Sequence, residues 1–239
     1  MEQRSFSVKE ALHFGWNITT KHLGYFVLVM IILFGVTAVF GFFDEMLEDG
    51  FLSGIIGILN FLVQVVVGIS LVKIVLEFLD GNPKPSWSEV TKSFSVFWKY
   101  LGGTILSSII IIVGLFFLII PGIYFALRYQ FVSYLIVDQG LSPVNALKKS
   151  SEMTKGIKLD LLWLGIVLFA VNLLGALVVF VGLLITIPVT MVAMGYVYRK
   201  VLGQTPMMPT KPQANIGEAV SVHPGEDLLE SPEDEDLLK

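Results

Sequence analysis

Four long apolar runs constrain this chain more than any other feature of its sequence. Two of them, residues 23–43 and 51–76, each have the length of one membrane-spanning helix, because a bilayer core of about 30 Å needs about 20 apolar residues. Only 15% of the residues are charged and 54% are hydrophobic, whereas soluble domains carry about 25% charged residues. We therefore expect an all-α integral membrane protein. Such a composition excludes a soluble domain, a wholly disordered chain and a basic nucleic-acid-binding protein.

The other two apolar runs are too long for one helix each. Residues 101–137 and 161–197 both extend over 37 positions. The first contains Pro121-Gly122, and the second contains Gly182 and Pro188. We predict that each run folds into a tight hairpin of two spans, which brings the total to six transmembrane helices.

The charges between the runs give the expected orientation. Lysine and arginine residues gather in segments 1–22, 80–100 and 138–160 and directly after the last run, whereas segment 44–50 has four acids and no base. Basic loops mark the cytoplasmic side, so both termini are predicted to be cytoplasmic. The first apolar run is a full span, so no cleavable signal peptide is expected. The predicted location is the bacterial inner membrane, crossed several times.

The spacing of short motifs predicts three repeats, over about 7–81, 86–140 and 142–203, within a membrane domain of residues 1–203. Serine followed three residues later by glutamate is a helix-start signal; it occurs at Ser7-Glu10 and Ser86-Glu89, and the third copy has Ser142-Pro143 instead. A glycine ends each unit, namely Gly81, Gly140 and Gly203. Two explanations stay open: duplication built a stable bundle, or the repeats surround a central site.

Each repeat is expected to open with a cytoplasmic amphipathic connector helix. The clearest apolar face belongs to the second connector, and the first and third are weaker. These faces would lie in the plane of the lipid headgroups or would simply brace the hairpins. Their apolar residues are Trp87, Val90, Phe94, Phe97 and Leu101 in the second connector, Val8, Leu12, Trp16 and Leu23 in the first, and Val144, Leu147 and Thr154 in the third.

Four polar residues inside the apolar runs are candidate contacts for a lipid or a solute: Arg128, Asn60, Gln64 and Asn172. A charged side chain at membrane depth costs about 2.5–3.5 kcal/mol on insertion scales, so it marks a functional position by default. Two interpretations of Arg128 remain: a ligand contact, or a structural pair with helix-end carbonyls or with Glu77, Asp138 or Asp160. For the amides, hydrogen bonds between helices are the favoured role. Gly165, Gly175 and Gly182 are expected to allow close helix packing.

Residues for catalysis are missing from the pattern. The chain has no cysteine, no paired carboxylates at membrane depth, no HExxH motif and no phosphate-binding glycine loop. We therefore predict no enzyme activity, no catalytic residues, no metal site and no cofactor.

The segment 204–239 differs from the rest of the chain. It has eight acids, two bases and five prolines, a composition typical of disorder. We predict a disordered, acidic, proline-rich cytoplasmic tail. Its acidic-dileucine patches, at 227–230 and 236–238, are candidate contacts for protein partners.

Residues 120–156 resemble a known family. The pattern Ile-Pro-Gly-Ile at 120–123, Arg128, Val137-Asp138, Gly140, Ala-Leu-Lys-Lys-Ser at 146–150 and Thr-Lys-Gly at 154–156 is similar to the membrane domain that precedes some bacterial glycerophosphodiester phosphodiesterases. It also resembles related stand-alone membrane proteins of unknown function. The resemblance implies a six-helix membrane domain. It implies no activity, because the phosphodiesterase needs a separate (β/α)₈ barrel of about 250 residues, and only 36 residues follow Gly203.

These observations lead to one expected function and one alternative. We expect a non-enzymatic scaffold or accessory module in contact with membrane lipids, including anionic ones. The alternative is a small transporter or lipid-handling protein with a polar cavity at Arg128.

Overall fold

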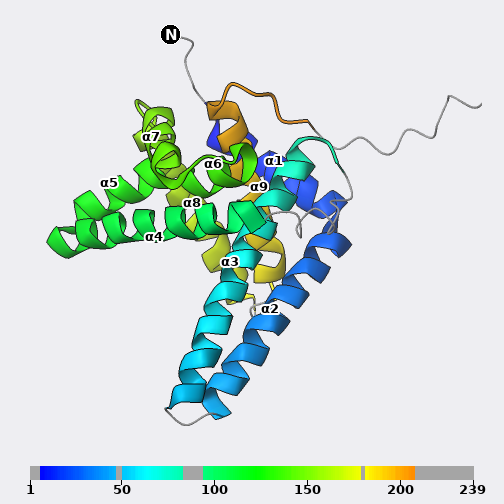
Figure 1. The fold of residues 1–239 in the computed structure, drawn as a ribbon. Helices are drawn as coiled ribbons and strands as arrows, with labels where there is room; N and C mark the ends of the chain where they lie inside the picture. Colours follow the sequence, from blue (N-terminus) through cyan, green and yellow to red (C-terminus); the bar gives the residue numbers. More distant parts are fainter. Residues whose placement is uncertain (1–5, 47–49, 83–93, 179–180, 208–239) are drawn as a thin grey trace, which may run out of the picture. The chain divides into compact units, whose positions relative to one another are not determined.

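A computed structural model describes residues 6–46, 50–82, 94–178 and 181–207. Helices account for nearly all of these residues (Figure 1). Their bounds are α1 Val8–Lys21, α2 Leu23–Met46, α3 Phe51–Leu79, α4 Phe94–Phe117, α5 Ile119–Tyr129, α6 Val132–Gln139, α7 Pro143–Met153, α8 Lys158–Leu177 and α9 Leu183–Val201. The described part of the chain is therefore all-α, as the apolar runs predicted.

Three helical hairpins, α2–α3, α4–α5 and α8–α9, make up most of the fold. The two helices of each hairpin contact one another, and Figure 1 shows the first two pairs running side by side. Large apolar side chains are exposed toward the ends of all three hairpins: Phe42, Phe43, Met46, Phe51, Leu52, Phe116, Phe117, Leu118, Ile119, Ile120, Leu173, Leu174, Leu177, Val178 and Val181. Water disfavours such surfaces, whereas the lipid interior of a bilayer does not.

Five helical segments are long and apolar enough to cross a membrane: Leu23–Phe43, Phe51–Leu79, Val96–Phe117, Ile119–Gln139 and Lys158–Leu177. The first two match the predicted single spans. The run 101–137 is divided at Leu118, where α4 ends and α5 begins, with Pro121 in the first turn of α5. Proline is tolerated there because that turn has no intrahelical partner for its N–H groups. The second helix of the third hairpin, α9, is not among the five.

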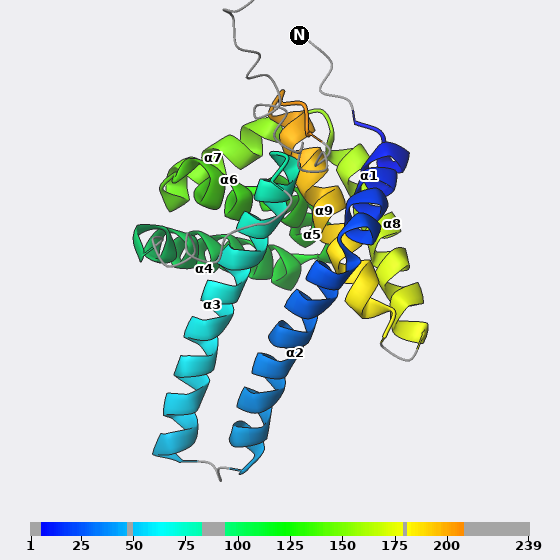
Figure 2. The same cartoon turned by 90° about the vertical axis from the view of Figure 1, so that its right-hand side faces the viewer.

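The span Ile119–Gln139 consists of two helices, α5 and α6, joined by a short break at Gln130-Phe131. Both Figure 1 and Figure 2 show α4 running across α3 rather than along it. The α4–α5 hairpin therefore has a different direction from the α2–α3 hairpin in this structure. The hairpin contacts α3, α6 and α7 through α4, and α7 and α8 through α5.

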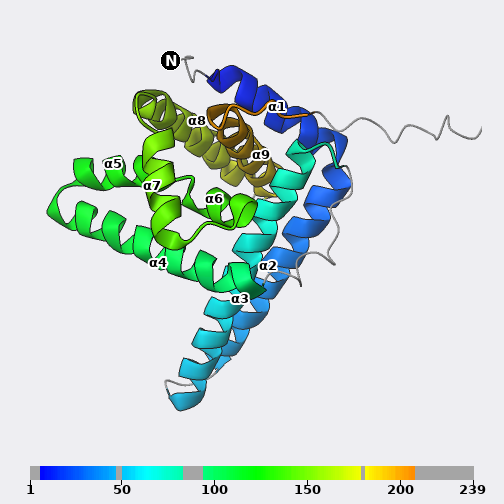
Figure 3. The same ribbon diagram turned by 45° about the horizontal axis from the view of Figure 1, so that its top comes forward.

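Helix α1 packs along α9, as Figure 3 shows from above. Ser7 caps α1 by accepting a 3.4 Å hydrogen bond from the Glu10 backbone N–H, as the helix-start motif predicted. The expected apolar face of Val8, Leu12 and Trp16 is not the face that meets α9, since the residues of α1 buried there are Ala11, Phe14, Gly15 and Ile18. Trp16 remains 55% exposed. Sequence spacing alone does not say which face of α1 meets α9.

The other two connectors have different outcomes. Most of the second, including Trp87 and Val90, lies outside the described residues, as does the helix-start motif at Ser86. The third is α7, which begins at Pro143 as predicted. Of its three expected apolar residues, Leu147 and Thr154 are buried and Val144 is exposed.

The three predicted unit ends share one backbone conformation. Gly81, Gly140 and Gly203 have φ values of 84°, 61° and 82° and lie one or two residues after the ends of α3, α6 and α9. This left-handed conformation ends a helix and favours glycine, which has no Cβ to clash. Of the predicted tail, residues 204–239, the structure describes only residues 204–207. There the Met207 N–H donates a 2.9 Å hydrogen bond to the Leu79 carbonyl.

Candidate functional site

The most extensive polar cluster in the described part of the chain surrounds Arg199, in the last turn of α9. Its guanidinium is paired with Asp80 at 2.8 Å and with Asp138 at 3.1 Å. It also donates a 2.7 Å hydrogen bond to the side-chain oxygen of Gln204. The Arg199 side chain is only 7% exposed, against 15% for Asp138 and 58% for Asp80. One buried cation therefore joins the ends of α3, α6 and α9.

A second layer of hydrogen bonds holds Asp138. The hydroxyl of Tyr198, which is fully buried, donates to the Asp138 carboxylate at 2.7 Å. Gln139 donates to that hydroxyl at 3.5 Å and accepts from Lys149 of α7 at 2.6 Å. The connector helix α7 is thus tied into the same network.

The charges of this cluster influence one another. Partial burial raises the pKa of the Asp80 carboxyl, against the opposing effect of the Arg199 guanidinium, and the neighbouring Asp138 adds to the rise.

Sequence reasoning missed this cluster, since it counted Arg199 only as a basic residue after the last run. The signal was nevertheless present. Asp80 and Asp138 lie one and two residues before Gly81 and Gly140, the ends predicted for the first two units, and Arg199 lies four residues before Gly203. The suggested pairing of Asp138 with Arg128 was wrong, because Asp138 binds Arg199.

Arg128 lies near the end of α5, where α5 contacts α7 and α8. Its Nε donates a 2.7 Å hydrogen bond to Ser151 of α7. Its backbone carbonyl accepts a 2.8 Å hydrogen bond from the Ser150 hydroxyl. Among the described residues Arg128 makes no ion pair, so Glu77 and Asp160 are not its partners either.

The three amide candidates lie in other parts of the fold. Gln64 donates to Thr37 at 3.3 Å and so joins α3 to α2. Asn172 donates to Thr190 at 3.2 Å and so joins α8 to α9. Asn60 shares a helix with Gln64, and its buried side-chain oxygen has no hydrogen-bond partner among the residues that the structure describes. The structure therefore does not bring these residues together with Arg128.

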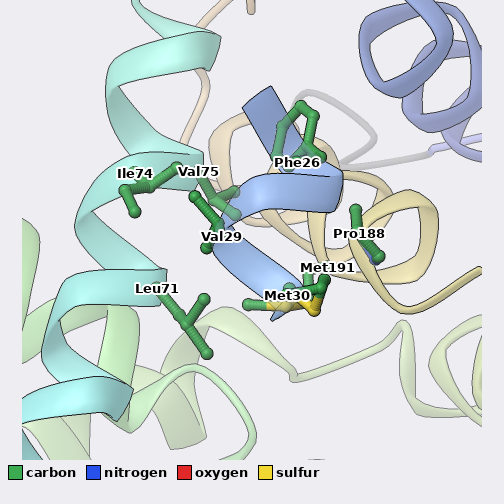
Figure 4. Close-up of a pocket in the computed structure, with 8 residues that line it drawn as sticks. All are labelled: Phe26, Val29, Met30, Leu71, Ile74, Val75, Pro188 and Met191. Atoms are coloured by element: carbon green, nitrogen blue, oxygen red, sulfur yellow. The ribbon is translucent and has the colours of Figure 1, made fainter. Parts of the chain in front are cut away.

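A small pocket in the described structure lies where α2, α3 and α9 meet (Figure 4). It is lined by Phe26, Val29, Met30, Leu71, Ile74, Val75, Pro188 and Met191. None of these side chains carries a charge or a strong hydrogen-bonding group, and none of the four candidate residues takes part. The described residues also contain no group of three histidine, cysteine or carboxylate side chains that could hold a metal ion.

Comparisons with known proteins give partial relatives. Uncharacterised proteins of Mycobacterium tuberculosis and Mycobacterium bovis are each 33% identical over 149 residues. The match covers 59% of this chain and 43% of each relative, so it extends over less than half of their length. No family model matches the chain, and no solved structure does. The chain is a multi-pass membrane protein whose described residues form helices almost throughout.

Proposed function

We propose that this chain is a six-span protein of the bacterial inner membrane that acts as a non-enzymatic scaffold or accessory module. Both termini would be cytoplasmic, and three repeats of connector and hairpin would build it. One observation carries the proposal: the polar side chains of the apolar helices are used to hold helices together. Arg199, Gln64 and Asn172 each bond to a neighbouring helix.

The alternative, a transporter with a polar cavity at Arg128, has less support. A solute path needs polar groups that line a common space, whereas Arg128, Gln64 and Asn172 bond to three different helices. The pocket between α2, α3 and α9 is apolar.

The recurrence of the helix order supports the repeats. Helix, hairpin and end glycine occur as α1–α2–α3 with Gly81 and as α7–α8–α9 with Gly203. The middle unit, α4–α5–α6 with Gly140, has the same ending. For the sixth span, α9 has 19 residues and pairs with α8 as the other hairpin helices pair. The resemblance to the membrane domain of the phosphodiesterases favours the same six-helix arrangement.

Single cysteines test the number of spans, because the natural chain has none. Six spans put Gln3→Cys and Thr205→Cys on the same side of the membrane, and five put them on opposite sides. We expect a membrane-impermeant maleimide to label both only after the inner membrane is opened. Leu118→Cys and Val181→Cys, at two hairpin ends, should be labelled in spheroplasts with an intact inner membrane. Labelling of Thr205→Cys in intact spheroplasts would refute the sixth span.

Native mass spectrometry tests the scaffold role. The protein is released gently from its own membrane, as wild type and as Arg128→Gln. A scaffold should retain the same protein partner in stoichiometric amount in both forms, and deletion of residues 208–239 should show whether the tail holds that partner. Release of a bound solute from the wild type, absent from Arg128→Gln, with no protein partner in either form, would favour the transporter instead.

A further inference from the structure

Two cations flank one tyrosine at the junction of α5 and α8. The Lys158 ammonium donates a 2.9 Å hydrogen bond to the Tyr124 hydroxyl. It also lies 4.2 Å from the centre of the Tyr124 ring. The Arg128 guanidinium is close enough to the same hydroxyl to interact with it. Tyr124 is 42% exposed, so this group of three is open to the surroundings.

Neither cation of this group is neutralised within the described part of the chain. Lys158 and Arg128 make no ion pair there. Arg128 is nevertheless held in place, because its Nε is bonded to Ser151 of α7. A fixed, partly buried guanidinium that lacks a carboxylate favours an external anion with oxygen acceptors.

The start of α8 adds donors to the same place. Lys158 is the first residue of α8, and the preceding Ile157 provides no side-chain cap. The first backbone N–H groups of a helix have no intrahelical partner and attract anions. One exposed acid, Asp160, stands in this turn and offsets part of the attraction.

Exposed apolar side chains continue from the cationic group along both helices. On α8 they recur three to four residues apart, which places them on one face: Leu159, Trp163, Ile166 and Phe169. On α5, Ile120 and Ile123 are exposed near Tyr124. A free phosphate would use only the cationic group, whereas a phospholipid would use the cationic group and the apolar face together. Tryptophan also favours the membrane–water interface.

We propose that Arg128, Tyr124 and Lys158 bind the phosphate of an anionic phospholipid whose acyl chains lie along the exposed face of α8. The site goes beyond the scaffold role, since it assigns a specific lipid to one junction of the fold. Arg128 and Lys158 donate to the phosphate oxygens, and Tyr124 sets the distance between the two cations.

The test uses the full chain in mild detergent, titrated with phosphatidylglycerol or with phosphatidylcholine of the same acyl chains. Native mass spectrometry gives the apparent Kd of the first bound lipid. Phosphatidylglycerol should bind more tightly, and Arg128→Gln and Lys158→Gln should each weaken it about tenfold, as expected for loss of one charge-assisted hydrogen bond. Asp160→Asn should strengthen it. Millimolar inorganic phosphate should not displace the lipid.

Lys148→Gln is the matched control, because it removes one positive charge from an exposed position on the neighbouring α7. It should leave the Kd within about twofold, since the exposed Lys148 lies on α7 without a hydrogen bond to Arg128, Tyr124 or Lys158 in the described structure, and salt weakens the interactions of exposed charges. Equal losses for Lys148→Gln and Lys158→Gln would refute a local site. Displacement by inorganic phosphate would assign the site to a soluble phosphate ligand. Should Arg128→Gln fail to fold by circular dichroism, Lys158→Gln decides alone, because its side chain bonds only the exposed Tyr124.

Discussion

Replacing Arg199 with methionine should destabilise the protein more than any other single change at the ion-pair cluster. The substitution keeps most of the apolar stem of the side chain and removes the charge. It leaves Asp138, only 15% exposed, without its cation. Breaking a buried ion pair by removing one partner costs about 3–5 kcal/mol, because the other charge stays buried and uncompensated.

The two carboxylates should differ in their contributions. Asp80 is 58% exposed, so Asp80→Asn should cost at most about 1 kcal/mol, the range of exposed pairs. Asp138→Asn removes the better buried pair and should cost more than Asp80→Asn but less than Arg199→Met, because Arg199 keeps Asp80 and Gln204.

Unfolding in mixed micelles of mild detergent and increasing SDS gives the free energies. Lys200→Met is the matched control: it removes one positive charge next in sequence, from a lysine that lies over the Tyr196 ring. A cost of Arg199→Met no larger than that of Lys200→Met would refute the reasoning. A second check is the double variant Arg199→Met with Asp138→Asn. It should be more stable than Arg199→Met alone, since it removes the uncompensated carboxylate.

Three further predictions follow from other parts of the fold. Gly175→Ala should destabilise the protein by about 1–3 kcal/mol in the same unfolding assay, because a Cβ there would overlap Thr186, whereas Gly165→Ala, with open space around it, should be neutral or stabilising. Burial and the neighbouring Lys21 lower the pKa of His22; its contribution to stability is therefore present above pH 6.5 and is lost as the pH falls toward its folded pKa, and in a pH series of unfolding measurements His22→Gln should remove that part of the dependence. Gln64→Leu should cost about 0.6 kcal/mol or less, the usual value of a hydrogen bond between membrane helices, and a larger loss would show that Gln64 does more than bond Thr37.

The helices were predictable because apolar length alone indicates them. The apolar runs 23–43 and 51–76 correspond closely to α2 and α3. Pro121 lies within three residues of the start of α5. The prediction of close helix packing is confirmed at Gly175 and Gly182, where an added Cβ would overlap a neighbour. It is wrong at Gly165, which has open space around it. A glycine in the sequence shows where a helix surface is small, but it does not show whether another helix packs there.

The polar contacts were harder to predict, since a pairing depends on which helix ends meet. Arg199 and its partners Asp80 and Asp138 lie at the ends of three separate helices, α9, α3 and α6, and their positions near the three glycines do not say which side chains pair. The same limit applies to α1. The sequence predicted an apolar face with Leu12 and Trp16, whereas α9 packs on the face that contains the small residues Ala11 and Gly15. In both cases the missing information is tertiary, because the partner lies far away in the sequence: 61 and 119 residues separate Arg199 from Asp138 and Asp80.

The packing of α1 against α9 also bears on how the chain is made. Phe14 of α1 meets Tyr196 of α9 with ring centres 4.8 Å apart, and the Tyr196 hydroxyl donates to Glu10 at 3.4 Å. The ribosome synthesises α1 first, so the face of α1 that packs on α9 stays uncovered until α9, which begins at Leu183, has been made. Asp80 and Asp138 are likewise synthesised before Arg199, the cation with which they pair. The early helices therefore enter the bilayer before these partners exist, and a chain that stops before α9 would keep the packing face of α1 uncovered and leave Asp80 and Asp138 without Arg199.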